Sequence, residues 1–144
     1  MEKDNSTVTS FVPLSYISKP IKLVFDGRGY EVLKNNTVEG TVRGHIEVNP
    51  EIQKRYGHII DFNRLFGGDI IVRAFAVCAE GDTFDENKGK AIAWAKAENK
   101  AYKIARRVIV KHRTKLFKLI DDFFMAAFNL NAYIKHNKEY LSQY

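Results

Sequence analysis

The sequence predicts an α+β fold, in which a mostly antiparallel sheet of four strands is followed by two long C-terminal helices. Two observations predict this fold. Residues 21–80 contain strand-like stretches, of which Thr37–Val48 alternates cleanly between apolar and polar positions, separated by turn sequences. Residues 90–144 contain neither glycine nor proline, which favours helix throughout. A run of strands followed by a run of helices is the element order of an α+β protein.

The length and composition indicate one globular domain without disulfides. The 144 residues suffice for one hydrophobic core. We expect a flexible N-terminal arm over residues 1–20 and a single α+β domain over residues 21–144. The one cysteine, Cys78, excludes an intramolecular disulfide and a cysteine-based zinc site within one chain. Since the sequence shows neither a signal-peptide pattern nor a membrane-spanning segment, we expect a cytoplasmic protein with no membrane partner.

Three strands are expected in the first third of the chain. Ile21–Phe25 leads into the turn sequence Asp26–Gly29, a strong hairpin signal. Tyr30–Lys34 then leads to Asn35–Asn36, two residues that tolerate positive φ. The third strand, Thr37–Val48, alternates cleanly between apolar or glycine positions and polar ones.

A short helix and a fourth strand are expected next. Asn49 fits a helix N-cap and Pro50 the first helical position, with the helix ending near Tyr56. Residues 58–68 read as an irregular connection with a helical turn near its end. The fourth strand, Asp69–Glu80, is apolar on both faces, which favours a central strand or an interface strand.

Two long helices are expected to complete the chain. Thr83 and Glu86 fit a capping box at the start of the first one. The β-branched residues 108–110 suggest a bend near 112–114, where the second helix would begin. The second helix is so apolar that it must be buried or packed on another subunit, so we expect a homo-oligomer formed through it. Its apolar positions include Leu116, Leu119, Ile120, Phe123, Ala127, Leu130 and Ile134.

Positive charge is concentrated in one segment. The net charge of the chain is +6, yet residues 85–118 alone carry +8 and both flanking segments are slightly acidic. Seven cations in this segment follow one another at steps of three or four, which places them on one helix face. This basic ridge consists of Lys96, Lys100, Lys103, Arg107, Lys111, Lys115 and Lys118. It favours an anionic partner, a nucleotide or a nucleic acid; the alternative is a charged face that only aids solubility.

Two further groups of residues could bind a ligand. Arg43 and Arg73, on neighbouring strands, could clamp a phosphate, or they could form cross-strand ion pairs with Glu39 or Glu47. Phe84, at the junction of strand and helix, could stack on a base or serve as an anchor to the core. No nucleotide-binding loop, nucleophile elbow or metal-ligand spacing of histidines occurs, so we expect no enzyme, no cofactor and no metal.

One stretch resembles a family. The residues that carry the resemblance are Cys78, Asp82, Phe84, Asp85, Gly89, Lys90, Ile92, Ala93, Lys96 and Ala97. This pattern resembles small phage-encoded proteins, and the order of a sheet followed by two helices is similar to that of the phage anti-Thoeris sponges. The resemblance implies an oligomer that sequesters a cyclic ADP-ribose signal without catalysis. It also implies that Phe84 stacks on the adenine and that Arg43, Arg73, Arg107 and Arg113 are candidates to hold the phosphates.

The expected function is therefore that of a non-enzymatic phage counter-defence protein that binds an anionic, nucleotide-derived immune signal. The alternatives are a nucleic-acid-binding protein that uses the basic ridge and a protein inhibitor of a host defence enzyme, such as an anti-CRISPR. The candidate ligand-binding residues are Arg43, Arg73, Phe84, Lys103, Arg106, Arg107, Lys111 and Arg113.

Overall fold

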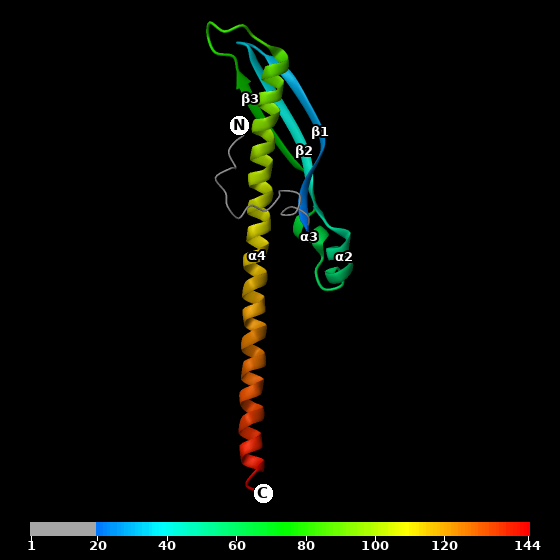
Figure 1. Cartoon of the computed structure of the whole chain (residues 1–144), viewed down its shortest axis with the longest axis vertical. Helices are drawn as coiled ribbons and strands as arrows, with labels where there is room; N and C mark the ends of the chain where they lie inside the picture. Colours follow the sequence, from blue (N-terminus) through cyan, green and yellow to red (C-terminus); the bar gives the residue numbers. More distant parts are fainter. Residues whose placement is uncertain (1–19) are drawn as a thin grey trace, which may run out of the picture. The chain divides into compact units, whose positions relative to one another are not determined.

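The computed structural model describes residues 20–144 and shows an α+β architecture with a three-stranded antiparallel sheet and one long C-terminal helix (Figure 1). The elements in chain order are β1 (Ile21–Leu33), β2 (Thr37–Val48), α2 (Pro50–Tyr56), α3 (Phe62–Phe66), β3 (Ile70–Val77) and α4 (Glu86–Leu141). The chain divides into two compact units, Met1–Arg106 and Arg107–Tyr144. The predicted N-terminal arm lies, apart from Pro20, outside the described residues.

The sheet has three strands, so the prediction of four is wrong. The expected hairpin at Asp26–Gly29 does not form, and β1 continues through it. A register shift between Phe25 and Gly27 leaves Asp26 as the extra residue of a β-bulge. Because a bulge absorbs one residue without ending the ladder, β1 pairs with β2 on both sides of it, from Ile21 opposite Val48 to Leu33 opposite Thr37.

The turns and short helices of the first unit confirm the sequence predictions. Asn35 and Asn36 have φ values of 62° and 52° in the turn between β1 and β2. The Asn49 side chain accepts a hydrogen bond from the Glu51 N–H (2.8 Å) and caps α2. The short helix α3 supplies the helical turn expected before Gly67.

β3 lies at an edge of the sheet, so it is not the central strand that its composition suggested. The strand order is β1-β2-β3, which makes β2 central. Val72, Ala74 and Ala76 are buried, whereas Ile71 and Val77 on the other face are 64% and 67% exposed. The apolar outer residues of β3 are therefore not covered by any described part of this chain.

One continuous helix, α4, replaces the two predicted helices. The expected bend near 112–114 does not form, because β-branched residues lower helix propensity by only about 0.5 kcal/mol each. The hydroxyl of Thr114 also finds a partner inside the helix, the Val110 carbonyl (2.9 Å). The predicted capping box at Thr83 is wrong as well: Asp85 accepts the Lys88 N–H (3.1 Å) and caps a helix that begins at Glu86.

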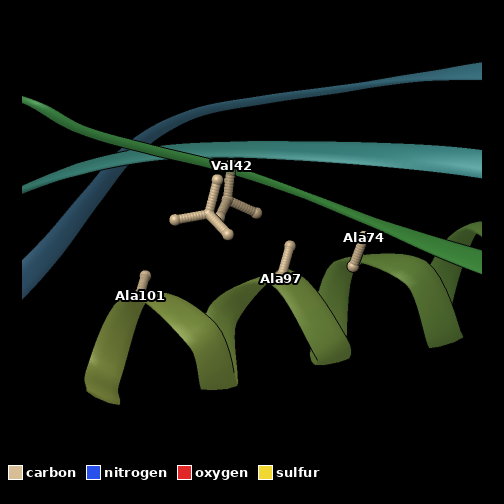
Figure 2. Close-up of a cluster of buried hydrophobic side chains, with 5 residues drawn as sticks. Val42, Ala74, Ala97 and Ala101 are labelled. Carbon is tan, nitrogen blue, oxygen red and sulfur yellow. The ribbon is translucent and has the colours of Figure 1, made fainter. Parts of the chain in front are cut away.

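The core lies between the sheet and the N-terminal half of α4. Every fourth helix residue there is an alanine and is buried; Ala93 shares a cluster with Val38 of β2, and Ala97 and Ala101 share one with Val42. These alanines are Ala93, Ala97, Ala101 and Ala105. Figure 2 shows Ala97 and Ala101 pointing toward Val42. The helix approaches a strand glycine closely, since a Cβ on Gly40 would lie 2.9 Å from the Ala93 Cβ.

Candidate anion-binding surface

The first two lysines of the basic ridge bind the edge of the sheet. Lys96 Nζ donates to the Phe75 carbonyl (3.1 Å), and Lys100 Nζ donates to the Arg73 carbonyl (3.2 Å). Both acceptors belong to β3, whose free edge would otherwise present unpaired carbonyls to water or to another strand. These two ammonium groups therefore have a structural task, and the ridge does not act as seven equivalent cations.

The remaining ridge cations are exposed. Four of them follow one another at steps of four, four and three residues in the second unit, and we call them the basic row: Arg107, Lys111, Lys115 and Lys118. At about 1.5 Å rise per residue the basic row is about 16 Å long. In the part of the chain that the structure describes, none of its members forms an ion pair with a carboxylate. Lys103, in the first unit, is exposed as well.

Arg113 and Arg106, two residues predicted to bind a ligand, project from faces of α4 that differ from the face of the basic row. At about 100° per residue, Arg113 projects about 120° around the helix from Arg107. Its guanidinium lies over the Phe117 ring, 5.3 Å from the centroid. Arg106 is exposed and adjacent to Arg107 in sequence, so its side chain also diverges from the basic row. Of the helix residues predicted to bind a ligand in the second unit, Arg107 and Lys111 share a face and Arg113 does not.

The outer face of the sheet, opposite α4, holds the other two predicted arginines. Arg43 Nε donates to Asp26 Oδ1 (2.9 Å), and Arg73 Nη1 lies 3.7 Å from Glu39 Oε2. The alternative of pairing with Glu39 is therefore confirmed for Arg73, whereas Arg43 pairs with Asp26, a partner that the sequence did not indicate. Asp26 reaches Arg43 from the β-bulge, a feature that the sequence pattern presented as a turn.

His45 completes the charge network on this outer face. Its Nδ1 lies 3.0 Å from Asp26 Oδ2, and its Nε2 lies 3.1 Å from Glu47 Oε2. The hydrogen bonds to Glu47 and to Asp26 raise the pKa of His45, because both favour the protonated ring. The hydrogen bond from Arg43 lowers the pKa of Asp26, with His45 adding to the effect. The cations of this face thus already have anionic partners.

A pocket of about 530 Å³ lies where β3 leads into α4. Phe84 lines it and at the same time packs against the buried cluster of Val38, Ala76 and Ala93, which fits the anchor interpretation. Asp82, Asp85 and Lys88 also line the pocket, so carboxylates outnumber ammonium groups. This balance disfavours phosphate, and the structure does not place Phe84 beside Arg43 or Arg73, which lie on the other face of the sheet.

Sequence reasoning missed a cluster of cations and aromatic rings beside β1. Trp94 Nε1 donates to the Gly29 carbonyl (2.8 Å), and the Arg28 guanidinium lies over the Trp94 ring, 4.2 Å from its centroid. Lys90 Nζ lies over the Tyr30 ring at 4.7 Å. The register of β1 places Arg28 and Tyr30 on the helix side, and that register depends on the bulge. The sequence therefore carried no usable signal for this cluster.

Residues 20–144 contain no group of three or more His, Cys, Asp or Glu side chains that could hold a metal ion. None of the helices there has the length and apolarity required to cross a membrane. Comparison of the chain with protein-family models, with curated proteins and with solved structures finds no match.

Proposed function

We propose that this protein binds nucleic acid, without catalysis, through the basic row on α4. The observation that carries the proposal is the charge of this stretch of helix. Residues 101–120 contain seven Lys and Arg and no Asp or Glu. Cations that already had carboxylate partners would gain little from a phosphate, whereas those of the basic row release the counterions of a polyanion when they bind it.

The length of the basic row supports a polymer over a small ligand. A DNA duplex carries about one negative charge per 1.7 Å of its axis, so about 16 Å of helix faces several phosphates at once. A mononucleotide could engage one or two members of the row and would leave the others without a partner. The row also lies on one face of an exposed helix, the arrangement expected for contact with a backbone.

The test is fluorescence anisotropy of labelled DNA and RNA duplexes and single strands across 50–200 mM salt. We expect affinity to fall steeply with salt, and the triple variant R107Q/K111Q/K115Q to reduce the slope of log K against log salt by about 2–3. A matched control, K22Q/K34Q/K54Q, removes three exposed lysines elsewhere and should leave the slope nearly unchanged. Equal effects of the two triple variants, or binding that is weak and insensitive to salt, would contradict the proposal.

A second candidate is capture of an anionic nucleotide signal in phage counter-defence, the activity implied by the family resemblance. The observation that favours it is the outer face of the sheet, where Arg43, Arg73 and the 46%-exposed Phe75 lie on adjacent strands. A ring and two guanidinium groups could hold a base and its phosphates if Asp26 and Glu39 released the arginines. Calorimetry against cyclic ADP-ribose isomers separates the candidates: heat at micromolar concentration favours capture, and none favours the polymer.

A further inference from the structure

The second unit exposes large apolar side chains along its whole length. Phe123, Leu130 and Ile134 are 66%, 61% and 52% exposed, and similar side chains surround them. Soluble proteins rarely leave a continuous apolar surface of this extent uncovered. The spacing of these residues indicates what covers them.

Some of these apolar residues follow a seven-residue repeat in two interleaved series, each of which also contains one polar residue. The first series is Ile109, Leu116, Phe123, Leu130 and Asn137. The second series is Arg113, Ile120, Ala127, Ile134 and Leu141. Alternating steps of three and four place all ten on one side of the helix, the pattern by which one helix packs along another in a coiled coil. We call this side the seam.

The side of the helix opposite the seam is mostly polar. It carries Lys118, Asp121, Asp122, Asn129 and Glu139. A helix lying on a membrane surface does not need a strict repeat of 3.5 residues and tends to carry cations on its polar face, whereas this face mixes both signs. A repeat of 3.5 residues instead fits a second helix of the same period.

We propose that the seam pairs with the seam of a second copy of this chain, and that the two helices run antiparallel. In an antiparallel pair centred on residue 125, Phe123 of each chain lies opposite Ala127 of the other. Large residues then face small ones in the middle of the pair. The neighbouring layers combine Ile120 with Leu130 and Leu116 with Ile134, all of similar size.

The outer layers also favour the antiparallel arrangement. Arg113 of one chain lies opposite Asn137 of the second copy, so the two polar seam residues meet each other. A parallel pair in register would instead place Arg113 against Arg113, and it would leave a crowded Phe123 layer beside an underfilled Ala127 layer. Like charges and mismatched volumes on a seam are costly, which selects the antiparallel pair.

The surface available is large enough for a stable dimer. A fully buried aromatic side chain removes about 150–250 Å² from solvent, and the seam residue Phe123 is 66% exposed, so each copy of it could bury on the order of 100 Å². With the aliphatic seam residues of two chains, the total exceeds the roughly 1,200 Å² of a small specific interface. Because the basic row leaves another side of the helix, this pairing does not depend on the proposed nucleic-acid binding.

The first test is the mass of the full-length protein in solution, measured by light scattering after size exclusion. We expect a dimer or a multiple of it, and F123D should reduce it to a monomer. The matched control F128D removes the same kind of side chain, 58% exposed, from a position of the same helix outside the seam and should leave the mass unchanged. Far-UV circular dichroism and Trp94 fluorescence of both variants report whether they remain folded.

The second test is orientation, on a Cys78→Ser background. Single-cysteine chains L116C and I134C, one of them tagged, are mixed and oxidised. The antiparallel pair should give mainly the mixed disulfide, since the two copies of residue 116 would lie about 27 Å apart. A monomeric protein at tens of micromolar, equal effects of F123D and F128D, or disulfides that join L116C chains to each other would overturn the proposal.

Discussion

The two halves of α4 differ in the size and in the exposure of the side chains on their apolar faces. The N-terminal half presents alanine at every fourth position, and Ala93, Ala97 and Ala101 are fully buried against the sheet. The C-terminal half presents phenylalanine, leucine and isoleucine at steps of three and four, and among them Ile120, Phe123, Leu130 and Ile134 are more than half exposed. Small residues thus belong to the contact that one chain completes by itself, and large residues to a surface that a single chain leaves open.

The cations of the two halves of α4 also differ in whether this chain supplies their binding partner. Lys96 and Lys100 donate to carbonyls of β3, whereas Arg107 and Lys111 have no carboxylate partner among the described residues. The cations of the basic ridge are therefore evenly spaced in the sequence but have two different roles. A lysine beside a sheet edge covers that edge, whereas an exposed cation of the basic row remains available to an external anion.

The strongest test of the comparison places the same substitution in each half. A97L adds a side chain where the helix touches Val42, and we expect it to lower the free energy of unfolding by about 3 kcal/mol, because a filled core must be displaced. A132L makes the same change at an exposed position of the C-terminal half and should alter it by less than about 0.5 kcal/mol. Urea unfolding followed by Trp94 fluorescence, at one protein concentration, measures both.

An equal loss in the two variants would show that the exposed half is as closely packed as the buried half. A small loss in A97L would show that the sheet and helix separate easily, which would contradict the burial of Ala97. Circular dichroism of the native proteins confirms that helix content is the same before unfolding begins.

The local patterns of the sequence predicted most of the fold. Caps and turns depend on a few neighbouring residues, so Asn49, Pro50 and the Asn35–Asn36 turn were predicted correctly. Alternation predicted β2 for the same reason, whereas the apolar composition of β3 indicated burial on both faces and only one of them is buried. The order of strands in the sheet depends on contacts distant in sequence, so the composition of β3 left both a central strand and an interface strand open, and the structure contradicts only the central position.

The wrong predictions share a physical cause. The sequence Asp26–Gly29 suits a hairpin turn, but continued pairing with β2 offers more ladder hydrogen bonds than a short hairpin, so the chain forms a bulge. Thr83 fits a capping box, but Asp85 offers a cap closer to the first residue that packs on the sheet. Differences of about 0.5 kcal/mol in local propensity are smaller than the contribution of such tertiary contacts, so the tertiary contacts decide the structure.

The candidate site could be predicted in part. The concentration of charge on α4 is a property of the sequence, and the exposure of the basic row agrees with it. The pairing of Arg43 with Asp26 depends on the bulge, and the hydrogen bonds of Lys96 and Lys100 depend on the position of the β3 edge. Neither could be inferred from composition or periodicity.

A smaller effect is expected where the backbone of β2 approaches the helix. In G40A the new methyl would lie 2.9 Å from the Ala93 Cβ and 3.0 Å from Trp94 Cδ1, so the helix must shift. We expect a loss of about 1–2 kcal/mol in the free energy of unfolding. G29A is the matched control, since nothing lies within 4 Å of a Cβ at that position, and it should be neutral or slightly stabilising. A neutral G40A would mean that the sheet and the helix are not in close contact at Gly40.

The smallest expected effect separates the two groups of ridge lysines. K96Q/K100Q removes two charges that serve the β3 edge, so the salt dependence of nucleic-acid binding should change by much less than one unit of slope. R107Q/K111Q removes two charges of the basic row and should lower the slope by about 1.5–2. Stability should respond in the opposite order, with a loss below about 1 kcal/mol confined to K96Q/K100Q, because a glutamine amide donates a weaker hydrogen bond to the Phe75 and Arg73 carbonyls than an ammonium group does. If both double variants lowered the slope equally, the seven ridge cations would act as one surface, and the division of α4 into a sheet-bound half and a ligand-binding half would be wrong.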